Sequence, residues 1–321
     1  MVLVEEVDLL IDFRFFIIAI VAVFLSLGLG IVLGSGFIGD PILRRVERNV
    51  ETVLSDNEAL EAEILDLEER IDENLEFMNA VEPVVLEGQL ASEQVVLIQP
   101  EGADRALREG VQGAVEAADG RVASVLTLNN KLALEDEGAR EDLATALESG
   151  LQQPGQLRNL FASELAMQLD ELTDAARPRA RRSGGDEELR AAEAIERLVN
   201  EGFLSIDGEE EAVPTDAGFV ILTGSPDQPE WAVQPVVETL ATTLGGRRSP
   251  LVVAETSDST WGVVADLRLG DVAETPFSTV DNGETPAGRV AIALALDEAP
   301  EVTGHWGLDD GAAAPVPTPS E

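Results

Sequence analysis

The 321-residue sequence contains no cysteine, no tyrosine, a single histidine and three methionines. Without cysteine the chain forms no disulfide, no thiolate metal site, no thiol nucleophile and no lipoprotein anchor. Copper(I) prefers cysteine and methionine ligands, and copper(II) prefers imidazole and carboxylate. The scattered Met1, Met78, Met167 and His305 give no visible soft-metal site, so no cofactor is evident and any metal ligands are unknown from the sequence.

Positive charge is scarce, because 62 Asp and Glu stand against 21 Lys and Arg and give a net charge of −41. Proteins bind nucleic acids by neutralising phosphates with cations, so a phosphate-binding face is excluded as the main function. This charge is typical of a haloadapted surface, or of a protein that works where salt screens its self-repulsion. A hydrophobic content of 45% excludes general disorder.

Catalytic and nucleotide-binding motifs are also missing. The sequence has no G-x-G-x-x-G, no G-x-x-x-x-G-K-[ST] and no G-x-S-x-G. Any Ser-His-Asp arrangement would have to use His305, which lies near the C-terminal tail, where we expect a surface or packing role. The sequence therefore predicts that the protein is not an enzyme.

The longest run without charge covers residues 15–39, and about 20 apolar residues suffice for a helix to cross a bilayer. We expect a retained transmembrane helix preceded by an acidic segment, residues 1–14. The alternative is a cleaved secretory signal, but such signals begin with basic residues, and the first cation here is Arg14. Small residues suited to close helix packing in lipid recur every fourth position: Ala22, Ser26, Gly30 and Gly34.

The charges beside this run do not settle its orientation. Arg14 precedes the run, whereas Arg44, Arg45 and Arg48 follow it. The positive-inside rule would weakly favour a cytoplasmic C-terminal side, but long domains can cross regardless of charge. The sequence leaves the side of the soluble region open.

A heptad repeat follows and predicts a coiled coil over residues 41–80. With Leu43 at position a, β-branched residues recur at a and leucines at d, the pattern of parallel two-stranded coiled coils. Asn57 also falls at a, where a buried amide fixes register and strand number. The predicted core consists of Leu43, Val46, Val50, Val53, Asn57, Leu60, Ile64, Leu67 and Ile71.

The flanking positions of this repeat carry like charges. In a parallel homodimer Asp56 would face Glu61 of the second chain, and Glu63 would face Glu68. Three explanations remain open: salt screens the repulsion, the partner helix is basic at these positions, or the helix packs on its own globular domain. We expect a parallel homodimer.

After this repeat the periodicity changes to alternating strand and helix patterns, which predict an α/β domain over 92–308. Such alternation implies a mostly parallel sheet covered by helices on both faces. We expect buried strands at 94–100, 120–128, 218–224, 250–255 and 289–296, and helices at about 103–118, 136–149, 156–176, 186–200 and 229–244.

Two segments are expected to lie outside the regular structure. A basic loop at 177–185 carries Arg177, Arg179, Arg181 and Arg182 and is read either as an exposed loop or as a docking site for an acidic partner or lipid headgroup. Residues 309–321, rich in Ala and Pro, are expected to form a disordered tail.

Three stretches resemble the actinobacterial MctB-type copper transporter family. These are Asp12–Gly36 followed by the heptads, Phe277–Asn282 with Ala287–Leu296, and Thr303–Gly307. The resemblance covers nearly the full chain in order. It implies a single-pass cell-membrane protein with an extracytoplasmic soluble region and a role in copper export or homeostasis, copper being implied by the resemblance only.

The residues themselves favour another reading. One helix cannot enclose a path for ions, and a small-residue face suits close packing better than conduction. The alternative is a non-enzymatic dimeric scaffold in the cell envelope. A coiled coil would hold an α/β domain and present it to an envelope partner, such as a cell-wall hydrolase in cell separation.

Overall fold

A computed structural model describes the backbone of residues 5–37, 39–174, 184–208, 213–269 and 276–318. The side chains of residues 5–12, 35–43, 174 and 184–188 are also outside the description. The chain divides into two compact units, Met1–Glu73 and Asn74–Glu321.

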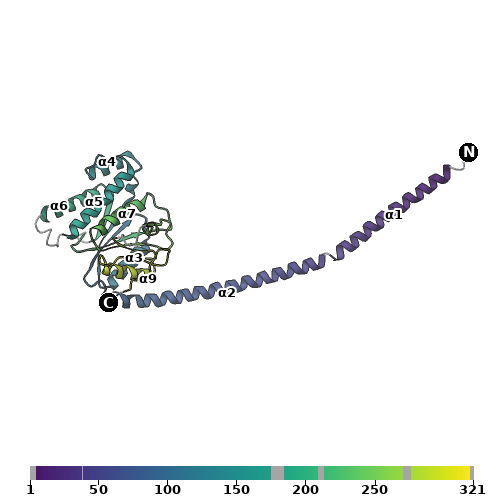
Figure 1. Ribbon diagram of the computed structural model, residues 1–321, viewed down its shortest axis with the longest axis horizontal. Helices are drawn as coiled ribbons and strands as arrows, with labels where there is room; N and C mark the ends of the chain where they lie inside the picture. Colours follow the sequence, from purple (N-terminus) through teal and green to yellow (C-terminus); the bar gives the residue numbers. More distant parts are fainter. Residues whose placement is uncertain (1–4, 38, 175–183, 209–212, 270–275, 319–321) are drawn as a thin grey trace. The chain divides into compact units, whose positions relative to one another are not determined.

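The first unit consists of helix α1 (Glu5–Phe37) and most of helix α2 (Gly39–Leu86) (Figure 1). Within α1 the segment Phe13–Gly34 has 22 residues and a mean hydropathy of 3.0, so it is long and apolar enough to cross a membrane. The hydroxyl of Ser26 donates to the carbonyl of Val23 at 3.1 Å, which satisfies this polar group within the helix.

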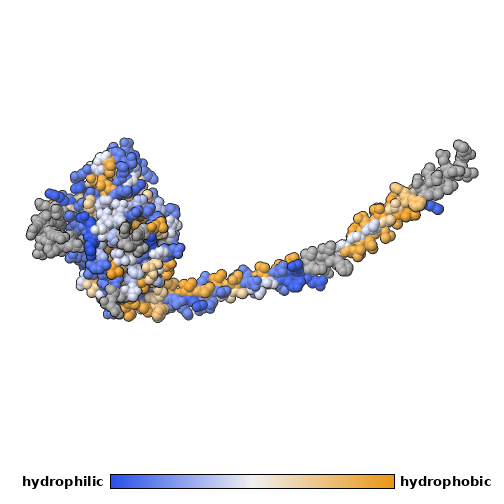
Figure 2. All heavy atoms as spheres, viewed as in Figure 1, coloured by the Kyte–Doolittle hydropathy of each residue, from blue (hydrophilic) through white to orange (hydrophobic). Residues whose placement is uncertain are grey.

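Helix α2 is amphipathic along its length, and its apolar side chains form a ridge (orange in Figure 2). The predicted core residues whose side chains are described are all exposed, and the exposed fraction of the apolar ones runs from 46% for Leu67 to 65% for Val53. Leu43 lies outside the described side chains. Asn57 donates from Nδ2 to Glu61 Oε1 at 3.1 Å along the same helix.

The second unit is built on a seven-stranded sheet in the order β3-β2-β1-β4-β5-β6-β7. Only the edge strand β3 runs antiparallel, and the other neighbours pair in parallel. The strands are β1 (Gln94–Pro100), β2 (Arg121–Leu128), β3 (Leu204–Gly208), β4 (Gly218–Thr223), β5 (Leu251–Glu255), β6 (Ser278–Val280) and β7 (His305–Trp306). The predicted mostly parallel α/β fold is confirmed.

Helices cover both faces of this sheet, and each face has its own hydrophobic core. Leu86 and Leu90, at and just beyond the end of α2, are buried in the second core. The short helix η1 (Asn130–Ala133) follows β2. The first face carries α4 (Glu137–Ala146), α5 (Pro154–Asp174), α6 (Gly184–Asn200), α7 (Val233–Gly246) and α8 (Val263–Leu267), and the second carries α3 (Arg105–Ala117) and α9 (Pro286–Glu298).

The strand predicted at 289–296 is wrong, because this segment belongs to helix α9. Thr285 caps the helix by accepting a hydrogen bond from Gly288 N at 3.0 Å, and Pro286 follows at the first turn. Its alanines and leucines are good helix formers, and a short apolar run alone does not separate a buried strand from a buried helix.

The disordered tail predicted from residue 309 is also wrong for residues 309–318. Ala313 N donates to His305 O at 2.7 Å, and Gly307 N donates to Ala314 O at 3.0 Å. Val316 packs against the second core. This segment covers the edge of the sheet beyond β7, where backbone groups would otherwise be unpaired. Residues 319–321 and the four arginines Arg177, Arg179, Arg181 and Arg182 lie outside the described residues.

Candidate functional site

Open α/β sheets bind ligands at the carboxyl ends of their parallel strands, at the point where the strand order reverses. This reversal lies between β1 and β4. Here the two following loops are joined, since Asp104 N donates to Gly224 O at 2.9 Å. Gly224 has a φ of +95°, a conformation that favours glycine.

Carboxylates occupy the helix N-termini at this edge. Asp104 accepts a hydrogen bond from Leu107 N at 2.8 Å and caps α3. Glu255 is buried and accepts from Val263 N at 3.1 Å and Val264 N at 2.7 Å. A bound phosphate would meet negative charge in place of free N–H groups. This arrangement agrees with the absence of a nucleotide motif in the sequence.

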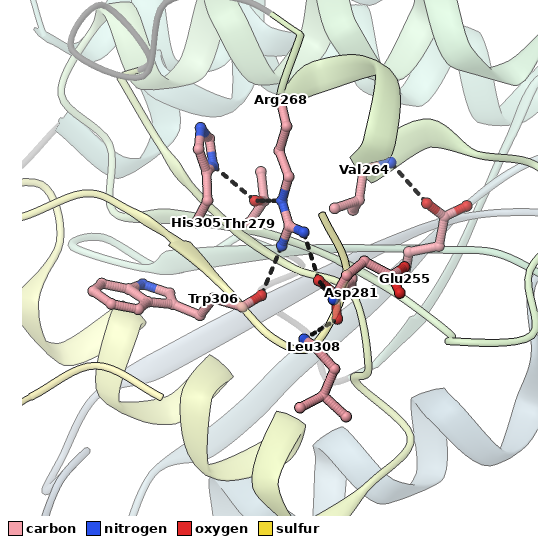
Figure 3. Close-up of polar contacts among 9 residues, drawn as sticks. Glu255, Val264, Arg268, Thr279, Asp281, His305, Trp306 and Leu308 are labelled. Atoms are coloured by element: carbon pink, nitrogen blue, oxygen red, sulfur yellow. Dashed lines mark hydrogen bonds and ion pairs between the residues drawn. The ribbon is translucent and has the colours of Figure 1, made fainter. Parts of the chain in front are cut away.

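The most extensive buried polar network of this edge centres on Arg268 and Asp281 (Figure 3). Arg268 Nη1 lies 2.5 Å from Asp281 Oδ2, and the two side chains are only 3% and 5% exposed. Asp281 also accepts from Leu308 N at 2.8 Å and Asp309 N at 3.1 Å. Arg268 Nη2 donates to Trp306 O at 2.7 Å. The pair therefore joins the loop after β6 to the segment after β7.

His305 belongs to this network and is buried, at 1% exposure. Arg268 Nε donates to Thr279 Oγ1 at 3.0 Å, so the threonine hydroxyl proton is free to point to His305 Nδ1, 2.8 Å away. Nδ1 is then an acceptor, and the neutral ring carries its proton on Nε2. Burial, and secondarily the charge of Arg268, lower the pKa of His305 below its usual value.

These contacts give His305 a packing role, one of the two alternatives expected from the sequence. Its Nε2 finds no hydrogen-bond partner among the residues that the structure describes. A buried unpaired donor costs about 1–3 kcal/mol. The network is suited to holding the C-terminal segment on the sheet, because every charged group in it points to a partner rather than to a cavity.

Residues 10–317 of the chain match the protein family described as "Copper transport outer membrane protein, MctB". The chain belongs to this family. Proteins named "Copper transporter MctB" from Mycobacterium tuberculosis (strain ATCC 25618 / H37Rv) and Mycobacterium bovis (strain ATCC BAA-935 / AF2122/97) are each 24% identical to it over 316 residues. The alignments cover 94% of this chain and 98% of each relative. The resemblance noted from the sequence is confirmed.

Membership of the MctB family, together with the apolar α1, indicates association with a membrane. The family name raises the question whether side chains of this chain could bind copper. Within the described part of the chain, no three or more His, Cys, Asp or Glu side chains group in a way that could hold a metal ion. Met78 and Met167 lie on separate helices, α2 and α5, and His305 lies in β7.

One contact of this MctB-family chain was not predicted from the sequence. Glu82, in the last turns of α2, pairs with Arg289 of α9 through Oε2···Nη2 at 2.5 Å and Oε1···Nε at 2.7 Å. Arg289 also donates to Asn79 Oδ1 at 3.2 Å and to Glu284 O at 2.7 Å. The partners are 207 residues apart, so no local pattern signals the pair. We call these contacts the α2–α9 clamp.

The residues predicted to carry function therefore fall into separate groups. Ala22, Ser26, Gly30 and Gly34 lie on α1, and the heptad residues lie on α2. The buried network of Arg268 and Asp281 belongs to the second unit. Two features bear most directly on how the chain is held together. The exposed heptad face of α2 offers an apolar surface for another helix, and the α2–α9 clamp fixes the end of α2 to the domain.

Proposed function

We propose that this MctB-family protein serves copper export or tolerance as a membrane-anchored dimeric scaffold, without forming the path for copper itself. The family match and the relatives named copper transporters support the link to copper. The described residues contain one helix able to span a membrane. A dimer would supply two such helices, too few to enclose a pore, and the small-residue face of α1 suits close helix packing.

The main support for the scaffold proposal is the exposed heptad face of α2. The apolar side chains described at the a and d positions up to Ile71 are 46% or more exposed, and an apolar stripe of this kind is stable in water when a second helix covers it. The domain at the end of α2 already buries its own cores. We infer that α2 pairs with a second copy in parallel, and that the small-residue face of α1 packs in the same orientation.

The salt environment decides how strong this pairing is. Asp56 with Glu61 and Glu63 with Glu68 are acidic pairs across a parallel homodimer. At an ionic strength of 1 M the Debye length is about 3 Å, so exposed pairs of this kind hardly repel. The net charge of −41 is consistent with such an environment.

A deletion strain tests the proposal. Cells lacking the gene should be more sensitive to copper and accumulate more of it, and the intact chain should restore both. Ile64→Asp places a charge in the heptad core and should fail to restore copper tolerance, whereas Glu69→Asp, at the outward position f, should restore it. Deletion cells with normal copper sensitivity and content would refute the link to copper.

The second candidate function is a scaffold for an envelope partner, such as a cell-wall hydrolase in cell separation. The exposed heptad face supports this candidate as well as the first, because such a face indicates pairing with another helix and does not indicate copper or any other ligand. A soluble region that lies outside the cytoplasmic membrane is required, and protease treatment of intact cells tests this. If the soluble region retrieves no envelope protein and deletion cells separate normally, this candidate fails.

A further inference from the structure

The last turns of α2 carry an apolar surface that extends beyond residue 80, where the predicted coiled coil ends. We define the domain-proximal face as Phe77, Met78, Val81, Val84 and Val85. Phe77, Val84 and Val85 are 66%, 72% and 41% exposed. All five residues belong to the second compact unit, which begins at Asn74. A partner of this face would therefore contact the domain unit directly.

The heptad register continues through this face without a break. Counting from Leu43 at a, Met78 and Val85 fall at a and Val81 falls at d. Asn74 falls at d, 17 residues after Asn57. An identical helix that lies parallel and in register places Asn57 opposite Asn57 and Asn74 opposite Asn74. This match favours a second copy of this chain over an unrelated helix.

The charges beside this face also differ from those of the middle heptads. Positions e and g there are occupied by Leu75, Phe77 and Val84, and no acidic pair crosses the interface. Glu82, at position e, is the one acid, and in a dimer it would lie beside Phe77 of the second copy. Arg289 already pairs with this carboxylate and neutralises it. The α2–α9 clamp removes the charge that would otherwise oppose association.

The clamp and the apolar face lie on different sides of α2. Glu82 and Leu86, four residues apart, point into the domain and are 9% and 0% exposed. Val81 and Val85, also four residues apart, form the neighbouring side, and Phe77 and Val84 lie further round. The domain therefore holds the helix while leaving Phe77, Val84 and Val85 exposed and Met78 and Val81 half-buried.

We propose that a second copy of this chain covers the domain-proximal face, so that the zipper continues into the domain unit and pairs the two α/β domains directly. This proposal rests on the dimer proposed above and deepens it. The middle heptads, with their acidic pairs, are then the weaker part of the interface, and the last turns are the stronger part.

Disulfide cross-linking tests this proposal, because the chain has no cysteine and an introduced one is its only thiol. Single substitutions Met78→Cys, Val85→Cys, Ile64→Cys and the outward control Glu76→Cys are made in the full chain in membranes. Mild oxidation with diamide should cross-link Met78→Cys and Val85→Cys into dimers at least as fully as Ile64→Cys, because core cysteines of an in-register parallel dimer lie side by side. Glu76→Cys should remain largely monomeric.

The outcomes separate this proposal from the dimer itself. Cross-linking at Ile64→Cys alone would overturn the pairing at the domain-proximal face and leave the dimer standing. Loss of cross-linking at all three core positions would overturn both. A cross-link from Val85→Cys to a different protein, with none between copies, would assign the face to another partner and overturn the proposal.

Discussion

The two units of this chain treat their apolar residues in opposite ways. The first exposes them, along α1 and on the heptad face of α2, whereas the second buries them in two cores on either side of its sheet. The domain thus has what it needs to fold within one chain. The helices leave theirs uncovered within the described chain, which is why we propose lipid and a second helix as their partners. Under this proposal, α1 and α2 specify assembly and the domain specifies the fold.

The largest expected effect comes from breaking the buried pair of the domain. Arg268→Ala leaves Asp281 charged and buried without its partner, which should lower the free energy of unfolding of the domain by about 3–5 kcal/mol. Thermal or urea unfolding measures this loss. Dimer formation by α2 should persist under conditions where the domain remains folded. The double variant Arg268→Met with Asp281→Asn should recover part of the stability, because no charge is then buried alone and the amide oxygen still accepts from a backbone N–H of residues 308–309. An equally unstable double variant would contradict this explanation.

The next effect tests the boundary between the two regions. Glu82→Gln removes the carboxylate of the α2–α9 clamp but keeps its size, and we expect a loss of about 1–3 kcal/mol in domain stability. Hydrogen exchange should show faster opening of residues 79–86. Glu87→Gln, an exposed neighbour, serves as the control. Equal exchange in both variants would mean that the clamp does not hold the helix end.

A smaller effect should appear as a pH dependence of the domain. His305 has a lowered pKa in the folded protein, so the unfolded chain takes up its proton at a higher pH. The free energy of unfolding should therefore fall as pH drops below about 6.5, by at most about 1.4 kcal/mol per pH unit, until the folded pKa is reached. His305→Gln keeps an acceptor for Thr279 and should lack this slope. Parallel curves for the two proteins between pH 6.5 and 5 would contradict a neutral buried ring.

The smallest effect concerns the acidic pairs of the heptads. Glu68→Lys converts the contact with Glu63 of the second copy into an opposite-charge pair, worth about 0.2–1 kcal/mol. Sedimentation at low salt should show a tighter dimer than in the unmodified chain, and the difference should vanish at high salt. Glu69→Lys changes the net charge equally at the outward position f. Equal dimerisation of the two variants at low salt would place the acidic residues outside the interface.

The sequence alone determined the elements whose cause is local. The uncharged run specifies α1 because its length matches a bilayer, and the heptads specify one face of α2 because side chains three and four apart share it. The continuous apolar strands β1, β2, β4 and β5 were recognisable because both faces of a parallel sheet are buried.

Only the tertiary structure decided the rest. The segment at 309–318 covers the sheet edge because of neighbours distant in the sequence. The helix at 289–296, in contrast, has local signals in its Thr285 cap and its alanines, and its apolar run alone did not separate it from a buried strand. Glu82 meets Arg289 across 207 residues, and Arg268 meets Asp281 and the carbonyl of Trp306 through the meeting of separate loops. Such contacts depend on where the sheet brings segments together, and no periodicity in the chain records them.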